Sequence, residues 1–312
     1  MKILKRILII PNALFIILLL IQLLPDKPYR IADVPQNTVI LAISLEVILL
    51  AVSFAVKKEK LRHTATDLIG IIFGVLIFWT LATIKLDLVG EAKHAVFPPP
   101  GAVLAIFGSD FLQIAVNIKD SLLLVFEGFI IGAAAAIPLG LIFGYSLRIG
   151  TAASYAAKFI SSISPLVYIP YGIVLLPSFR SVSVMVIIIA SFFPILASTI
   201  SGVLGVDKKL TDSAKTLCIS KFTMLSQIIL PASLPQIFIG CNQGLSVSFI
   251  LLISAEMIGA RSGMGYYVNN YANFGNYTNA LAGVITIGVV VTIVTFLFGL
   301  LSKYLLRWKQ QA

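Results

Sequence analysis

Long apolar runs separated by short polar loops are the feature that most constrains this chain. A helix rises 1.5 Å per residue, so about 20 apolar residues cross a bilayer core about 30 Å thick. Eight runs of this kind occur: Ile3–Leu24, Thr38–Val56, Leu68–Ile84, Ser121–Ser146, Ala152–Leu176, Val182–Leu204, Pro231–Ile258 and Ala280–Leu301. We therefore predict an all-α polytopic membrane protein with about eight transmembrane helices.

Composition excludes a water-soluble fold for most of the chain. It is 59% hydrophobic and 12% charged, whereas soluble domains carry about 25% charged residues. The first run follows Lys2, Lys5 and Arg6, as in a signal peptide. It is longer than the usual apolar region of a signal peptide, and Leu24-Pro25-Asp26 offers no small-x-small cleavage site. We expect a retained helix.

The distribution of positive charge predicts the orientation in the membrane. With the N-terminus in the cytoplasm, sixteen of the 23 Lys and Arg residues fall on the cytoplasmic side and seven on the other. Eight spans also return the C-terminus to the cytoplasm. The formal net charge of +10 is then explained by the orientation of a multi-pass protein in the plasma (inner) membrane. It no longer indicates nucleic-acid binding.

One segment on the outer side has an unusual composition. His94–Pro100 cannot be a membrane helix, because its three prolines lack N–H donors and fix φ. Apolar residues then recur at spacings of four, four and three, which predicts a short amphipathic helix on the outer membrane face. These residues are Val103, Phe107, Phe111 and Ile114. An ordered loop is the alternative.

The longest polar cytoplasmic stretch between late spans is residues 205–225. Thr211 or Asp212 can cap a short helix there. One face of that helix would be apolar: Leu210, Ala214, Leu217 and Cys218. A short helix across the membrane base, with one apolar stripe among lysines, suits contact with another protein. The alternative is a loop helix that packs on its own subunit.

This stretch resembles the cytoplasmic signature of ABC importer permeases. That signature is Glu-Ala-Ala, three residues, Gly, nine residues, then Ile-x-Leu-Pro. The chain has Asp212-Ser213-Ala214, three residues, Cys218, nine residues, then Ile228-Ile229-Leu230-Pro231. Asp for Glu and Ser for Ala are mild changes. Cys218 in place of Gly is the larger departure, because only Gly allows some tight turns and close backbone approaches.

The resemblance covers about residues 96–308 and is closest to permeases of the nitrate, sulfonate, taurine and bicarbonate importer group. It is carried in order by Phe97–Pro100, Ser121-Leu122, Gly128-Phe129, Gly132, Pro138–Gly140, Gly144, Pro165–Pro170, Phe192–Pro194, Pro231, Pro235, Ala255–Met257, Gly263–Gly265 and Trp308. Two positions depart from the group: Leu124 stands where an Arg is common, and Leu176-Pro177 replaces Phe-Gly.

The resemblance implies a type I ABC importer permease core formed by the last six helices. Residues 1–66 would be two extra helices and a basic loop, and residues 67–312 the core. Within the core, the first helix would be 68–84, the outer loop and amphipathic helix 85–120, the bundle 121–303 and the coupling loop 205–230.

The resemblance also implies the partners: two permease copies in a homodimer, two ATPase subunits beneath them, an extracytoplasmic binding protein and membrane lipid. ATP would be bound by the ATPase, since the chain has no Gly-x-x-x-x-Gly-Lys-Ser/Thr loop. The substrate would be a small anion such as a sulfonate, taurine, nitrate or bicarbonate. A permease for another small solute, such as a vitamin precursor, is the alternative. The coupling residues would be Asp212, Ser213, Ala214, Leu217, Cys218, Ile228, Leu230 and Pro231.

Three carboxyl groups fall inside predicted spans: Glu46, Glu127 and Glu256. A charged residue costs about 2.5–3.5 kcal/mol at mid-bilayer on insertion scales, so each should face the bundle interior, a water-filled path or the interface. Glu256 could line a gate or hold helices together, whereas structural or interfacial roles are favoured for the other two. Glu256, Glu127 and Tyr168 are the candidate path residues.

Small residues and prolines predict how the bundle packs. Glycines recur every fourth residue in three places, at Gly128 and Gly132, Gly140 and Gly144, and Gly240 and Gly244. In lipid this spacing lets helix backbones approach closely. Five prolines should kink or end helices: Pro138, Pro165, Pro170, Pro194 and Pro235.

Two other classes of membrane protein are possible. A secondary transporter or channel often shows inverted repeats and charged pairs in mid-membrane, and neither is evident. An intramembrane enzyme needs a polar catalytic set, but His63 and His94 are isolated and fall on opposite sides. Cys218 and Cys241 do not form a metal or disulfide pattern. We expect no catalysis and no cofactor in this chain.

Overall fold

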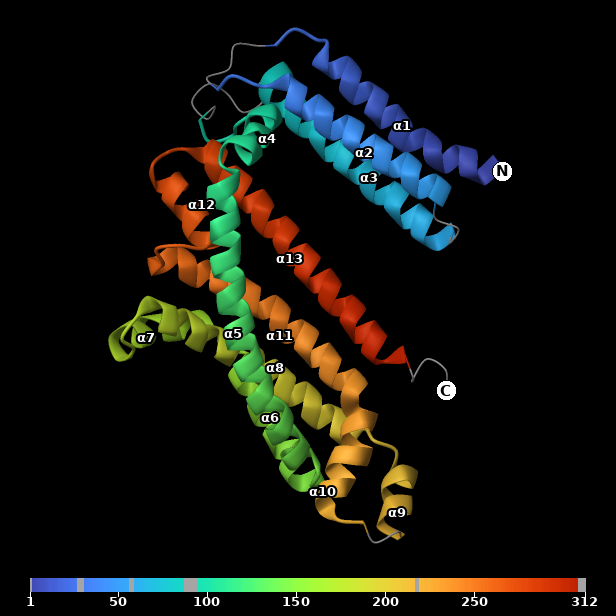
Figure 1. Ribbon diagram of the computed structural model, residues 1–312, viewed down its shortest axis with the longest axis vertical. Coiled ribbons are helices and arrows are strands. Elements are labelled where there is room, and N and C mark those ends of the chain that lie inside the picture. The colour runs from blue at the N-terminus through green and yellow to red at the C-terminus, as the bar shows by residue number, and fades with distance from the viewer. Residues whose placement is uncertain (1, 27–30, 56–58, 87–94, 217–218, 308–312) are drawn as a thin grey trace. The chain divides into compact units, whose positions relative to one another are not determined.

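The computed structural model describes residues 2–26, 31–55, 59–86, 95–216 and 219–307, which form helices joined by short turns (Figure 1). They divide into two compact units. The first comprises residues 1–113 and 270–284, and the second residues 114–269 and 285–312. Each unit has its own hydrophobic core.

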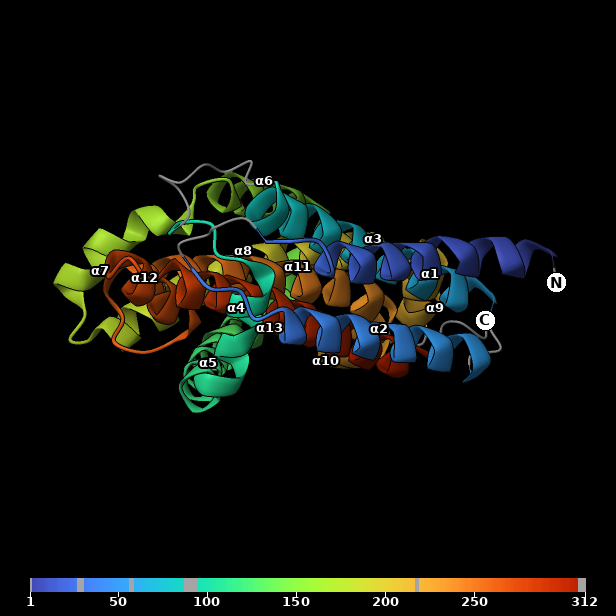
Figure 2. The same ribbon diagram turned by 90° about the horizontal axis from the view of Figure 1, so that it is seen from above.

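Three antiparallel helices make up most of the first unit: α1 (Lys2–Gln22), α2 (Pro35–Ala55) and α3 (Glu59–Thr80). They run side by side in both views (Figures 1 and 2). Their core includes Leu18 and Phe73. The units therefore do not divide at residue 66, because α3 packs against the two helices before it. That α3 belongs functionally to the permease core stays a prediction.

A short helix, α4 (Pro100–Ser109), packs against α2 and α3. Val103 on it is fully buried, and Asn37 donates a hydrogen bond to the Gly101 carbonyl. The prediction that one helix carries Val103 through Ile114 is wrong, since α4 ends at Ser109 and a second helix begins at Phe111. The buried side of α4 faces protein; its position on the membrane surface stays a prediction.

Asp33 lies at the N-terminal end of α4. Burial raises the pKa of its carboxyl group, while the neighbouring backbone groups of Val34, Gly101 and Ala102 lower it. A Cβ on Gly101 would lie 2.7 Å from the Val34 carbonyl carbon, so glycine is required for this close approach. Asp33 thereby fixes the start of α4 against the connection between α1 and α2.

In the second unit, α8 (Phe179–Leu204) packs between α5 (Phe111–Gly144) and α11 (Leu230–Gly259). The predicted glycine spacing explains this close packing. Cβ atoms added at Gly128 and Gly144 would each lie 2.7 Å from a Cβ on α8. Gly240 and Gly244 approach α8 from the other side. The prediction that these glycines serve helix packing is confirmed.

The predicted single span Ala152–Leu176 is not one continuous helix. The chain makes α6 (Leu147–Ser161), a 3-10 turn (Pro165–Tyr168) and α7 (Ile169–Leu175), with a bend of 73° between α6 and the following segment. Pro165 begins the turn and Pro170 the first turn of α7, where proline is tolerated but cannot continue a preceding helix. By contrast Pro138, Pro194 and Pro235 lie inside continuous helices.

Among the described residues, five helices are long and apolar enough to cross a membrane, or six if the bent pair forms one span. They are His63–Lys85, Phe111–Gly144, Phe179–Leu204, Lys221–Gly259 and Tyr277–Leu305. The described parts of α1 and α2 count as shorter apolar helices, Ile10–Gln22 and Pro35–Ala51. The all-helical membrane fold is thus confirmed, and the number eight stays a prediction.

Candidate functional site

The polar stretch predicted to meet another protein joins α8 to α11 and contains the helix α9 (Lys208–Thr216) (Figure 1). Its N-cap is Asp207, whose Oδ1 accepts a hydrogen bond of 2.9 Å from the Lys209 N–H. The prediction that Thr211 or Asp212 caps the helix is therefore wrong. An Asp directly before the helix satisfies one of the free N–H groups of the first turn.

One residue of α9 anchors it to the base of the bundle. Ala214 is 3% exposed and lies in a small apolar cluster with Val203, Met224 and Ile229. Asp212 and Ser213 are exposed on the same helix. Leu217 and Cys218 lie outside the described residues. The predicted apolar face is thus divided, because Ala214 faces its own subunit and Leu210 is 52% exposed.

The return from α9 to α11 is a short capped turn followed by a widened helix. Ser220 Oγ accepts from the Thr223 N–H at 3.1 Å and begins α10 (Lys221–Thr223). A π-helical stretch, Met224–Ile229, then leads directly into α11. Pro231 lies in the first turn of α11 and lacks an N–H, so the wider turn before it accommodates the missing donor.

The residues of the Ile-x-Leu-Pro ending have a packing role. Ile228 is partly buried against the Ala214 cluster, and Leu230 packs against the large core of the second unit. Pro231 is half-buried. Phe222, by contrast, is 78% exposed on α10. The segment therefore combines an anchored inner side with exposed Leu210, Asp212, Ser213 and Phe222, an arrangement that suits docking of a second protein.

Glu256 is buried near the end of α11, with 1% of its surface exposed. Its carboxyl oxygens accept hydrogen bonds from Ser121 Oγ at 2.6 Å and from the Gly265 N–H at 2.7 Å. Ser121 Oγ also accepts from the Met264 N–H at 2.8 Å, and Asn117 Oδ1 accepts from the Gly263 N–H. Glu256 thus joins α5, α11 and the turn leading into α12 (Met264–Asn273).

Glycine is required in that turn. Gly263 has φ of +118°, which side chains other than glycine rarely adopt. The carboxyl group fills the space in which a Cβ at Gly263 would lie, with its carbon 2.4 Å from that position. This geometry supports the helix-holding role of Glu256 over a gate-lining role.

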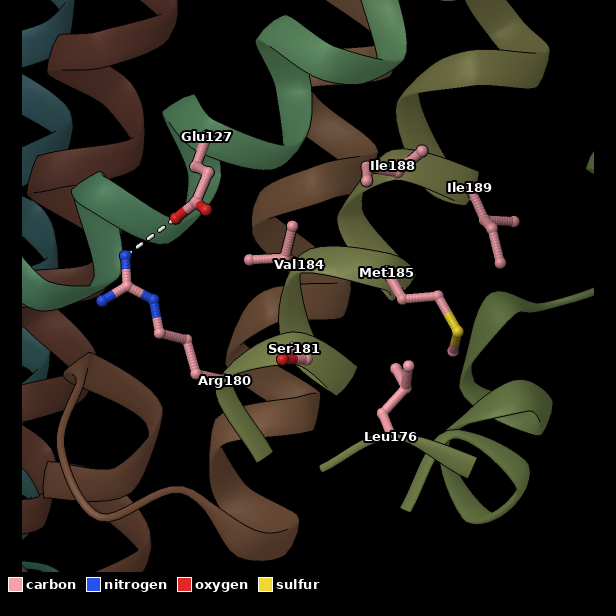
Figure 3. A pocket seen from close by; sticks show the side chains of 8 residues that line it. All are labelled: Glu127, Leu176, Arg180, Ser181, Val184, Met185, Ile188 and Ile189. Atoms are coloured by element: carbon pink, nitrogen blue, oxygen red, sulfur yellow. Dashed lines mark hydrogen bonds and ion pairs between the residues drawn. The ribbon is translucent and has the colours of Figure 1, made fainter. Parts of the chain in front are cut away.

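Glu127 forms an ion pair of 2.8 Å with Arg180 at the edge of a cavity of about 310 Å³ (Figure 3). The rest of the cavity wall is largely apolar and comes from Leu176 and the first turns of α8. A carboxyl group inside a span needs such a partner. Tyr168 is half-buried in the 3-10 turn, and Glu46 is half-buried on α2 in the first unit. Their roles stay predictions.

Four residues that position the candidate site were not predicted in that role from the sequence. Asp207 could have been found, because an Asp immediately before a helix is a capping signal. The partners Ser121, Asn117 and Arg180 had no such signal, because their contacts with Glu256, Gly263 and Glu127 cross 53 to 146 residues of chain.

Comparison with known proteins agrees with the all-helical membrane fold. A sequence profile described as the binding-protein-dependent transport system inner membrane component matches residues 128–311. That range includes α9, the π-helical stretch and Glu256.

Three relatives extend the match over most of their own length. An ABC transporter permease protein of Brucella abortus (strain 2308) is 31% identical over 64% of this chain and 80% of the relative. An aliphatic sulfonates transport permease protein of Bacillus subtilis (strain 168) is 28% identical over 70% of this chain and 80% of the relative. The taurine transport system permease protein of Escherichia coli (strain K12) is 26% identical over 80% of this chain and 92% of the relative. The chain belongs to the family of binding-protein-dependent transport system inner membrane components, and it is a membrane-spanning permease of an ABC importer.

Proposed function

We propose that this permease receives the energy of ATP hydrolysis through α9 and carries a small anion across the membrane. The observation that carries the proposal is that one side of α9 packs against the bundle and the other side is exposed. Ala214 holds the helix to α8 and the π-helical stretch, while Leu210, Asp212 and Ser213 remain exposed. A helix attached to the bundle on one side and open on the other can transmit the movement of a docked partner.

The connections of α9 define where that movement goes. Three residues separate α9 from the end of α8, and the π-helical stretch continues without a break into α11. Both helices pack along each other through Gly202, Gly240 and Gly244. A displacement of α9 by a closing ATPase pair would therefore change how α8 and α11 lie against each other. The sliding or rotation of such packed helices is a common form of conformational switching.

The partners follow from the family and from the orientation predicted by charge. ATPase subunits would dock on the cytoplasmic side, and a binding protein would deliver substrate from the other side. Both termini would lie in the cytoplasm. Two copies of this chain would form the path, with two ATPase subunits beneath them.

The proposed substrate class is a small anion. The relatives named above include permeases for aliphatic sulfonates and for taurine, which carry a sulfonate group. Away from α9, a cavity of about 640 Å³ includes both Arg180 and Arg261 with one acidic residue, Asp120, in its lining. Arg180 is already paired with Glu127, so the charges of this cavity do not select an anion, and the proposed substrate class follows from the relatives.

Asp212→Arg tests the docking role. The side chain is exposed, so the variant should reach the membrane in normal amount but bring down less of the ATPase subunit on purification. Gln227→Arg, at an exposed position on the neighbouring π-helical stretch, is the matched control. Normal recovery of the ATPase with Asp212→Arg would refute the docking role. Ala214→Lys is a different experiment, because it buries a charge in the anchoring cluster and should displace α9 itself.

A further inference from the structure

A polar groove lies in the second unit. It has a volume of about 480 Å³ and is formed by α6, α8 and α11. The lining residues are Lys158, Ser161, Ser162, Pro194, Ala197, Ser198, Ser201, Gln236 and Gln243. On each helix they recur at spacings of three, four or seven, so each helix turns one face toward the groove.

Most polar side chains of this groove differ from the buried hydroxyl groups elsewhere in the bundle in their hydrogen bonding. Ser183, Ser191, Thr199, Ser233 and Ser248 each donate to the carbonyl four residues earlier, at 2.7 to 3.2 Å. In the groove, Ser162 donates in the same way to the Lys158 carbonyl at 2.9 Å. Over the described part of the chain, Ser198, Ser201, Gln236 and Gln243 make no side-chain hydrogen bond, nor does Lys158 form an ion pair.

Unpaired polar groups on membrane-spanning helices are unfavourable unless water or a ligand satisfies them. Several such groups on three helices, all facing one groove, indicate that the groove is wet. Its position agrees with this, because Ser201 lies one turn before the end of α8 and Gln236 lies two turns into α11. From Ser201 to Pro194 the groove extends about 10 Å along α8.

The chemistry of the lining selects the charge of what enters. Lys158 is its one ionisable residue, and neither Asp nor Glu lines it. Hydroxyl and amide groups can donate hydrogen bonds to an anion as it loses water. A single Lys is a compact point charge and not a bidentate clamp, so it attracts an anion without holding it tightly. Weak binding is what a transit site needs.

We propose that this groove is the inner half of the translocation path and that Lys158 makes it selective for small anions. The inference rests on the proposed transport function and adds the residues and the charge selectivity. Neither Lys158 nor the two glutamines were among the candidate path residues predicted from the sequence. Glu256 and Glu127 do not line the groove.

Charge-selective thiol labelling tests the groove without knowledge of the natural substrate. Ser201→Cys is introduced into the full-length chain carrying Cys218→Ala and Cys241→Ala, in inside-out membrane vesicles. The probes are 2-sulfonatoethyl methanethiosulfonate, an anion, and 2-(trimethylammonio)ethyl methanethiosulfonate, a cation. We expect the anionic probe to react faster, and Lys158→Met to lower the anion-to-cation rate ratio about fivefold or more, as expected for a unit charge within about 10 Å.

Three controls keep the result specific. Lys158→Arg keeps the charge and should keep the ratio, which separates charge from damage to the fold. Lys119→Met removes an exposed charge from α5 and should leave the ratio unchanged. Ser248→Cys places a thiol at a fully buried position of α11 and should not react with either probe.

The labelling rates test the groove, and a separate uptake measurement tests transport. If neither probe reacts at Ser201→Cys, lipid or a second copy of the chain covers the groove and the inference is overturned. A ratio that Lys158→Met leaves unchanged also overturns it. ATP-dependent uptake by the unmodified complex is measured separately with labelled taurine. Uptake together with an unreactive groove would leave the transport function standing and remove only this inference.

Discussion

Truncation of Glu256 is the sharpest test of how the second unit is held together. The carboxyl group is buried and accepts hydrogen bonds from Ser121 and Gly265. Glu256→Ala removes both acceptors and leaves both donors buried. An unsatisfied buried donor costs about 1–3 kcal/mol, so the loss is about 2–6 kcal/mol of the free energy of unfolding. For a unit of this size, in which 1 kcal/mol shifts Tm by about 2–4 °C, that corresponds to a fall in Tm of roughly 4–24 °C.

The assay can use a thiol already present in the core. Cys241 is 6% exposed on α11, so a fluorogenic thiol reagent should react with it only on unfolding. Melting curves are recorded in detergent in a Cys218→Ser background. Ser254→Ala is the matched control, because Ser254 lies on the same helix but its hydroxyl is exposed and bonds only to the Ile250 carbonyl. That control should melt within about 1 °C of the parent.

Glu256→Gln separates the two roles predicted for this residue. The amide oxygen can still accept from Gly265, and its NH₂ group can donate to Ser121, whose oxygen has two lone pairs. A residue that holds helices together should therefore tolerate Gln in both stability and transport. If Glu256→Ala melts with the parent, the hydrogen bonds of Glu256 do not stabilise the fold. If Glu256→Gln melts normally but abolishes transport, Glu256 acts in the gate and our structural interpretation is wrong.

Two further predictions concern packing and pH. Gly140→Leu should destabilise the second unit by about 1–3 kcal/mol, because a Cβ at Gly140 would lie 2.6 Å from the Thr199 Cβ. Gly288→Leu is the control, because nothing lies within 4 Å of a Cβ at that position. If the two variants melt at the same temperature, α5 does not pack closely on α8. Burial raises the pKa of Asp33 above 3.8, so the native first unit binds this proton more tightly than the unfolded chain and loses stability as pH rises from about 4 through the native pKa. The melting of Trp79 fluorescence in a Trp308→Phe background should follow that trend, and Asp33→Asn should weaken it. An identical pH profile in the variant would contradict the assignment.

The sequence predicts the helices of the second unit well where apolar periodicity and composition decide the structure. The predicted run Pro231–Ile258 differs from α11 by one residue at each end. The glycine spacings also predict packing, because close approach of helices in lipid depends on small residues at fixed intervals. The broken span between Ala152 and Leu176 was less predictable, since prolines also occur inside the continuous helices α5, α8 and α11.

Contacts between distant segments explain most of what the sequence could not predict. Glu256 and Ser121 are separated by 135 residues, and no local pattern pairs them. Ala214 fitted the predicted apolar face of α9, but its burial against Val203 depends on how α9 folds back beneath α8. The groove around Lys158 combines faces of three helices. Each polar residue in it reads, in the sequence alone, as an ordinary interruption of an apolar run.

Uptake under controlled ATP hydrolysis tests the central claim most directly. The permease is reconstituted with its ATPase subunits and binding protein in proteoliposomes, and entry of labelled taurine is followed with a panel of small anions as competitors. We predict uptake that requires ATP, stops when the ATPase subunit carries an inactivating substitution, and falls with Asp212→Arg in proportion to the loss of bound ATPase. Uptake that continues with an inactive ATPase would contradict the account and indicate a secondary transporter.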